Sequence, residues 1–148
     1  VTQICDFFCN LYPMLNRDLL LTAAMFHDVG KLSELSTFPA NDYTDDGQLL
    51  GHIMIGAMEV QKHIDQIAGF PKRTASELIH CILAHHGELE YGSPKKPALA
   101  EAIALSFADN SDAKLETMRE ALSNIPENSL EWQGFNRFLD SNIRRTGK

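Results

Sequence analysis

Residues 18–31 read Asp-Leu-Leu-Leu-Thr-Ala-Ala-Met-Phe-His-Asp-Val-Gly-Lys, and the side chains before the histidine are mostly apolar. A segment that is apolar nearly all round is typical of a helix in the middle of a bundle, with Asp18 as its expected N-cap. Gly30 is expected to end this helix in a left-handed conformation. His27 and Asp28 then lie in apolar surroundings, where charge must be paired or bound to a metal. The segment therefore predicts a central helix that presents both side chains to a divalent cation.

The rest of the chain shows recurrent helical periodicity and no sustained strand alternation. After a first helix that begins at or before Val1, we expect helices over residues 18–28, 49–68, 74–86, 97–124 and 130–145. Thr74 and Glu77 predict a capping box for the helix over 74–86. The polar stretch 36–47 predicts a loop long enough to act as a lid. The predicted fold is an all-α bundle of about five to six helices around a metal site, in a single domain over residues 1–148.

Further residues of metal-binding types follow the first segment, namely His52, His85, His86 and Asp109. We expect helix ends and one central helix to bring them to one point, as in metal sites built in bundle cores. A single His-Asp pair would indicate little, but this combination predicts a metal site. Asp28 could bridge two ions, and Lys31 could bind a phosphate oxygen as a point charge. Mixed imidazole and carboxylate ligands favour Mn, Fe, Zn, Ni or Mg. His63 and His80 lie off the expected faces and are predicted to be non-ligands.

Composition restricts the class of protein further. The chain has 148 residues, is 44% hydrophobic and carries a net charge of −7. It contains neither the roughly 18–20 consecutive apolar residues of a membrane span nor a secretory signal, so the expected compartment is the cytoplasm. The acidic balance argues against strong nucleic-acid binding by this segment alone. The basic clusters Lys72-Arg73, Lys95-Lys96 and Arg144-Arg145 are expected to be solvated surface, although they could guide a phosphate backbone. An odd cysteine count, from Cys5, Cys9 and Cys81, predicts core thiols.

The order and spacing of these residues resemble the HD domain superfamily of metal-dependent phosphohydrolases, whose pattern is H…HD…D with further histidines between. The resemblance covers nearly the whole chain. It identifies His27 and Asp28 with the HD pair, His52 and His85 with the histidines of a second metal position, and Asp109 with the terminal aspartate. His86 matches a residue that is a metal ligand in some branches and a substrate contact in others.

A narrower resemblance links the chain to the HD domain of YhaM-type 3′-to-5′ exoribonucleases. It rests on residues 43–53, on Glu-Tyr-Gly-Ser-Pro at 90–94 after His85-His86-Gly87, and on Asp-Asn-Ser-Asp-Ala-Lys at 109–114. The resemblance implies two divalent ions, with manganese first, and a single-stranded nucleic acid substrate. It also implies an OB-fold before the HD domain. Tyr91 either stacks on a base of the substrate or packs on its own loop, and the sequence leaves both readings open.

Two parts of the family pattern have no counterpart in the chain. The first histidine is expected just upstream of Val1, and the OB-fold is expected further upstream, so we expect the chain to be part of a longer protein. The leading interpretation is a metal-dependent exoribonuclease-like domain in which Asp28, Lys31 and His86 act in catalysis and Lys31, His86 and Tyr91 contact the substrate. The alternatives are a nucleotide or phosphomonoester hydrolase on the same fold, and a non-catalytic metal- or nucleotide-binding module. The sequence leaves the oligomeric state open.

Overall fold

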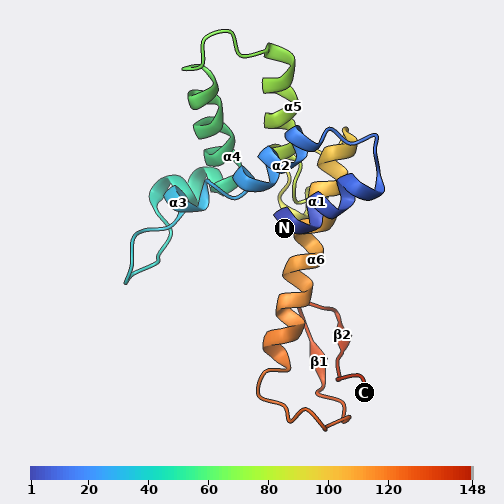
Figure 1. Ribbon diagram of the computed structural model, residues 1–148. Coiled ribbons are helices and arrows are strands. Elements are labelled where there is room, and N and C mark those ends of the chain that lie inside the picture. The colour runs from blue at the N-terminus through green and yellow to red at the C-terminus, as the bar shows by residue number, and fades with distance from the viewer. Residues whose placement is uncertain (148) are drawn as a thin grey trace. The chain divides into compact units, whose positions relative to one another are not determined.

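The computed structural model describes residues 1–147 and confirms the predicted helical class (Figure 1). The chain divides into two compact units, Val1–Asp109 and Asn110–Lys148. The predicted single domain over residues 1–148 therefore stays a prediction. The elements follow the order α1 Thr2–Leu11, α2 Arg17–Phe26, α3 Lys31–Glu34, α4 Asp45–Ile64, α5 Lys72–Leu83, the 3-10 helix η1 Leu89–Tyr91, α6 Ala100–Ala121, β1 Phe135–Asn136 and β2 Ser141–Asn142. No helix within the described residues is both long and apolar enough to cross a membrane.

In the first unit, α2 packs against α1 and α5, while α4 packs against α3 and α5 (Figure 1). The face of α2 that enters the core alternates large and small side chains, Leu19, Leu20, Ala23 and Ala24, all of them buried. Alanines allow neighbouring helices to approach closely, and the leucines fill the space between them. Cys5 and Cys81 are fully buried in the same core, as predicted for core thiols, whereas Cys9 is only partly buried against it. This packing fixes the C-terminal end of α2, where the His-Asp pair lies.

The start of α2 corrects one prediction. Asn16, rather than Asp18, is the N-cap, and its side-chain oxygen accepts a hydrogen bond from the Leu19 backbone N–H at 3.2 Å. The backbone N–H of Asn16 donates in turn to the buried Glu101 carboxylate at 2.7 Å. Asp18 lies inside the first turn, where a negative charge still favours the positive end of the helix dipole.

Gly30 corrects a second prediction. Its φ of −62° and ψ of −21° are right-handed and helical, so it does not end α2 by a left-handed turn. Its missing side chain matters for contact instead. A Cβ atom at this position would lie 2.0 Å from the carbonyl oxygen of His52 and 2.6 Å from the backbone nitrogen of Gly56. Gly30 thus allows the His-Asp segment to touch the backbone of α4.

Helix α4 begins four residues earlier than predicted and contains a break. Thr44 caps it, accepting a hydrogen bond from the Gly47 backbone N–H at 2.9 Å. The backbone at Gly51 is non-helical, with φ 70° and ψ 158°, a conformation that favours glycine. The helix resumes at His52, which therefore lies at the first position of a new helical segment.

The starts of α5 and α6 also differ from the predicted ones. Helix α5 begins at Lys72 without a side-chain cap, so the predicted capping box of Thr74 and Glu77 is wrong. The Glu77 carboxylate instead accepts a hydrogen bond from Arg73 Nε at 2.8 Å. Helix α6 begins at Ala100, three residues after the proline that was expected to open it.

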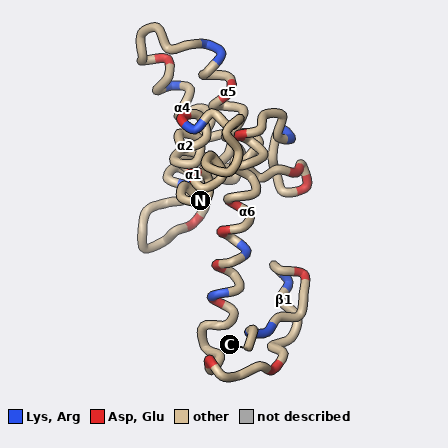
Figure 2. The backbone as a smooth tube through the Cα atoms, turned by 45° about the vertical axis from the view of Figure 1, so that its right-hand side comes forward, with Lys and Arg blue, Asp and Glu red and all other residues tan. Residues whose placement is uncertain are grey.

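The second unit corrects the prediction of a terminal helix over residues 130–145. This stretch forms the antiparallel pair β1–β2, with Phe135 opposite Asn142 (Figure 1). The Asn136 side chain accepts hydrogen bonds from the backbone N–H groups of Phe138 and Leu139, a local bond that competes with helix formation. Positive φ angles at Gly134 and Asp140 are also incompatible with a continuous right-handed helix. In the part of α6 that belongs to this unit, charges of both signs alternate (Figure 2), as expected of a solvated helix face.

Candidate metal centre

The structure brings together the five residues that the sequence analysis predicted as metal ligands, and His86 with them. They form two groups, the first His27, Asp28 and Asp109, the second His52, His85 and His86. Within each group one candidate ligand atom per residue lies within 4.8 Å of the others. The residues come from the end of α2, the resumed part of α4, the turn after α5, and the interior of α6. All of them belong to the first compact unit.

Asp28 lies between the two groups. Its Oδ2 atom is 3.4 Å from Nε2 of His27. Its Oδ1 atom is 3.5 Å from Nε2 of His52 and 3.7 Å from Nε2 of His85. Each carboxylate oxygen therefore faces one group, which is the arrangement that a carboxylate bridging two cations requires.

The other ring nitrogen of each histidine faces an oxygen. The Nδ1 contacts are Ala24 O for His27 at 2.9 Å, Glu34 Oε1 for His52 at 3.1 Å, Ile82 O for His85 at 2.6 Å, and Tyr91 O for His86 at 2.7 Å. A carbonyl or carboxylate oxygen can only accept, so in a neutral ring the proton belongs on Nδ1 and the lone pair on Nε2. Oriented histidines of this kind are typical of metal ligands held by outer partners.

Four buried atoms at the centre have no hydrogen-bond partner. They are Nε2 of His27, His52 and His85, and Oδ1 of Asp28. An unsatisfied buried polar atom costs about 1–3 kcal/mol, and four at one point form a strong exception to the usual pairing of such atoms. Imidazole nitrogen and carboxylate oxygen are donors that divalent cations of the Mn to Zn series accept. The residues present therefore fit a divalent metal.

Burial and charge shift the pKa values of the two inner histidines in opposite directions. Burial lowers the pKa of His85 to about 4, with further lowering from the neighbouring His86 and His27 rings. Burial of His27 also opposes its charging, but the carboxylates of Asp109 and Asp28 outweigh this and raise its pKa. His85 is thus neutral at pH 7, as a metal ligand must be.

The two carboxylates stay ionised. Burial opposes ionisation of Asp28, but its contact with the Lys31 ammonium, 2.7 Å away, and the His27 ring lower its pKa. Burial likewise opposes ionisation of Asp109, and His27 lowers its pKa. Both aspartates are therefore available as anionic ligands across the neutral range.

The depressed pKa of His85 predicts how stability depends on pH in metal-free protein. Between about pH 6.5 and 4 the unfolded chain binds a proton at His85 that the folded chain does not. The free energy of unfolding should therefore fall by about 3 kcal/mol as the pH drops through this window. Urea unfolding in EDTA at several pH values measures this slope. In His85→Gln the slope should be reduced, and an equal slope in both proteins would contradict the assignment.

The other shifted groups of the metal centre act outside that window. The raised pKa of His27 gives stability that is complete below about pH 6.5 and is lost as the pH rises through its folded value. The lowered pKa values of Asp28 and Asp109 give stability that is lost only as the pH falls below 3.8. The combined contribution of His27 and His85 to the stability of the metal-free protein should consequently be largest near pH 6.5.

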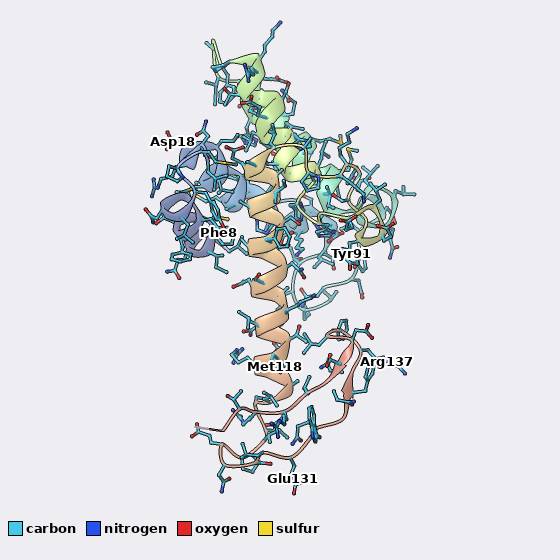
Figure 3. The ribbon with its side chains drawn as sticks, turned by 90° about the vertical axis from the view of Figure 1, so that its right-hand side faces the viewer. Phe8, Asp18, Tyr91, Met118, Glu131 and Arg137 are labelled. Atoms are coloured by element: carbon cyan, nitrogen blue, oxygen red, sulfur yellow. The ribbon has the colours of Figure 1, made fainter. Side chains whose placement is uncertain are left out.

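Four further residues that the sequence analysis considered lie outside the two groups of candidate ligands. Tyr91 lies on the loop after α5 and is 69% exposed (Figure 3). Lys31 is half exposed and paired with Asp28. The two histidines predicted to be non-ligands lie outside both groups: His63 faces Glu59 on the surface of α4, and His80 accepts a hydrogen bond from the Ala98 backbone N–H at 2.9 Å.

One residue of the site was missed by sequence reasoning. Glu34 is 8% exposed, and its Oε1 atom contacts both the backbone N–H and the ring of His52. In the sequence it is a single carboxylate one turn after Lys31, 18 residues before its partner. The signal that could have identified Glu34 is its burial. The helix that carries it has only four residues, which is too short for a periodic pattern that would predict burial.

A helical bundle with a His-Asp pair at its centre and histidines from neighbouring helices defines the class of protein. The HD domain family model matches residues 1–114, and the chain belongs to this family. It is 44% identical over 123 residues to the 3'-5' exoribonuclease YhaM of Geobacillus sp. (strain WCH70), covering 83% of this chain and 38% of that protein. It is 43% identical over 116 residues to the 3'-5' exoribonuclease YhaM of Bacillus subtilis (strain 168), covering 78% of this chain and 37% of that protein. The chain thus spans little more than a third of these curated relatives, and no solved structure matches it.

Proposed function

We propose that the chain is the HD domain of a metal-dependent phosphodiesterase that shortens single-stranded RNA from its 3′ end. The observation that carries the proposal is the convergence of four unpartnered buried donor atoms around Asp28. The names of relatives at 42–44% identity support the choice of RNA and of the 3′-to-5′ direction. The compartment that we propose for this reaction is the cytoplasm.

In this proposal His27, Asp28 and Asp109 hold one divalent ion, and His52 and His85 hold a second with Asp28 as the bridge. Manganese is the first choice, and Fe, Ni, Zn or Mg would suit the same donors. When bound, the ions supply positive charge that polarises the phosphodiester and makes a water molecule easier to deprotonate. The two oxygens of Asp28 face different groups, so this carboxylate would supply a ligand atom to each position.

Three residues are proposed to contact the substrate. Lys31 carries its ammonium beside Asp28 and is half exposed, so a phosphate oxygen can reach it from solvent. The ring of His86 lies 4.4 Å from that of His85 between ring centroids, and its Nδ1 is held by the Tyr91 carbonyl. This bond ties the Tyr91 loop to the metal centre. The exposed Tyr91 ring is then available to stack on a base.

A substrate panel tests the proposal. With Mn²⁺ present, 5′-labelled single-stranded RNA should shorten in steps from its 3′ end, whereas mononucleotides and p-nitrophenyl phosphate should not turn over. The same RNA in a blunt duplex serves as the control for strand selectivity. Preferential turnover of mononucleotides would instead support the nucleotide or phosphomonoester hydrolase. Metal or nucleotide binding without any turnover, even after the upstream sequence is restored, would support a non-catalytic module.

Metal binding should also stabilise the fold, because it relieves the unpartnered atoms. At a free Mn²⁺ concentration about 100 times its Kd, the free energy of unfolding should rise by about 2.7 kcal/mol. Thermal unfolding with Mn²⁺ or with EDTA measures the shift. The variant His63→Gln, altered outside both groups, should keep the full shift, and His85→Gln should lose most of it. An equal shift in the two variants would place the metal elsewhere.

A further inference from the structure

We infer that Glu34 is a positioning residue that fixes both the backbone and the ring of His52 for metal binding. The inference rests on the proposed metal centre, since His52 is taken as one of its ligands. Glu34 itself does not belong to either group of candidate ligands. It acts through His52 alone.

Glu34 first supplies a hydrogen-bond partner to the backbone of α4. Gly51 interrupts the helix with its φ of 70°, so the N–H of His52 starts a new helical segment. Such an N–H has no partner within its own helix and needs one from elsewhere. Glu34 Oε1 accepts this hydrogen bond at 2.9 Å. Glu34 therefore acts as an N-terminal cap supplied by α3 to the resumed helix.

Glu34 also contacts the imidazole ring of His52. The same Oε1 atom lies 3.1 Å from Nδ1 of His52. An oxygen that already accepts from the backbone N–H must also accept from the ring, so the neutral ring carries its proton on Nδ1. The lone pair is then on Nε2, the atom 3.5 Å from Asp28 Oδ1. One carboxylate oxygen thus selects the tautomer that can bind a metal.

The backbone of Glu34 is itself held in place by contacts with Thr44 and the start of α4. The carbonyl oxygen of Glu34 accepts hydrogen bonds from the Thr44 hydroxyl at 3.2 Å and from the Thr44 backbone N–H at 2.9 Å. A Cβ atom at Gly47 would lie 2.2 Å from this carbonyl oxygen, so α4 passes directly against it. Within residues 1–147 the Glu34 carboxylate has no ion pair with lysine or arginine, and His52 is its charge partner. A buried carboxylate held in this way has little freedom to serve another purpose.

Manganese binding to three forms of the protein tests the inference. Glu34→Gln keeps an oxygen that can accept both bonds, whereas Glu34→Met keeps the length of the side chain and removes the acceptor. Equilibrium dialysis should show that Glu34→Met weakens one of two Mn²⁺ positions about 10- to 100-fold, the usual effect of losing an outer partner of a ligand. Glu34→Gln should bind more like the unaltered protein. Equal affinities in all three forms would overturn the inference.

Two controls separate positioning from general damage. Glu59→Met alters a partly exposed glutamate of α4 that pairs with Lys62 and His63, and it should leave Mn²⁺ binding unchanged. In the His52→Ala background, Glu34→Met should cause no further loss, because its target is already absent. A further loss in that background would show that Glu34 acts elsewhere.

The tautomer of His52 provides a readout that needs no variant to fold. In metal-free protein at pH 8, ¹⁵N-resolved NMR of the imidazole should show the proton on Nδ1. A proton on Nε2 would overturn the inference. The measurement also separates the two proposals: if the RNA panel fails while the tautomer and the Mn²⁺ pattern hold, the substrate assignment falls and the role of Glu34 stands. If the unaltered protein binds no Mn²⁺, the proposed function falls and the tautomer alone decides the role of Glu34.

Discussion

Asp28→Ala should abolish Mn²⁺-dependent shortening of RNA, with a loss of at least about 10³-fold in rate. The two oxygens of Asp28 face different groups of candidate ligands, at 3.4 Å from His27 and 3.5 Å from His52. Losing a bridging carboxylate removes several kcal/mol of interaction with the metal charge, and about 4 kcal/mol corresponds to a factor of 10³. Initial rates on a 5′-labelled RNA, at saturating Mn²⁺, measure the effect.

Asp18→Ala is the matched control for this experiment. Asp18 is a carboxylate at the opposite end of the same helix, and it makes no cap there. The control should retain most of the activity. Circular dichroism of both variants verifies that the helix content of the protein is retained. Activity of Asp28→Ala within tenfold of the unaltered protein would contradict the bridging role and, with it, the two-ion arrangement.

Gly30→Ala should destabilise the first unit by about 3 kcal/mol or more and should also weaken metal binding. The added Cβ would lie 2.0 Å from the carbonyl oxygen of His52, and backbone at that distance must move. Overpacking usually costs about 1–3 kcal/mol, and a clash with backbone belongs at the upper end. The φ of −62° at Gly30 suits alanine, so conformation alone would make this substitution neutral or stabilising. A loss of stability in Gly30→Ala would therefore come from the contact with His52 and not from the backbone conformation of residue 30.

Urea unfolding and Mn²⁺ titration measure the two consequences of Gly30→Ala. The graded control is Gly56→Ala, where a Cβ would approach the backbone nitrogen of Gly30 to 3.1 Å, a tight but less severe contact. Its effect on stability should be distinctly smaller. If Gly30→Ala and the unaltered protein were equally stable, the backbone of Gly30 would lie too far from His52 for an added Cβ to come within 2.0 Å of its carbonyl oxygen.

The central helix and the general nature of the site were predictable because both follow from local rules. An apolar run with helical length indicates a buried helix, and ionisable residues at its end indicate a partner of opposite charge. Boundary errors at α2 and α5 arose where two residues compete for one role. Asn16 and Asp18 can each cap a helix, and Glu77 can bond either a backbone N–H or Arg73; only the folded geometry selects between such partners.

The prediction of a helix over residues 130–145 failed for a different reason. Trp132, Phe135 and Phe138 recur every three residues, which is compatible with a helical face, yet all three are largely exposed. Without a core to bury that face, local preferences decide the structure. The turn made by Asn136 and the positive φ of Gly134 and Asp140 then favour a short hairpin.

By itself, the sequence determined the helical class, the central position of the segment with His27 and Asp28, and the residue types from which a metal site could be built. These follow from periodicity and from the cost of burying charge, which act over a few residues. The tertiary structure alone decided that Asp28 lies between two groups of candidate ligands, that Gly30 serves as a contact point rather than a helix stop, and that Glu34 contacts the backbone and ring of His52. Those features depend on distances between segments far apart in the chain, which are set by how the helices pack and not by any local pattern.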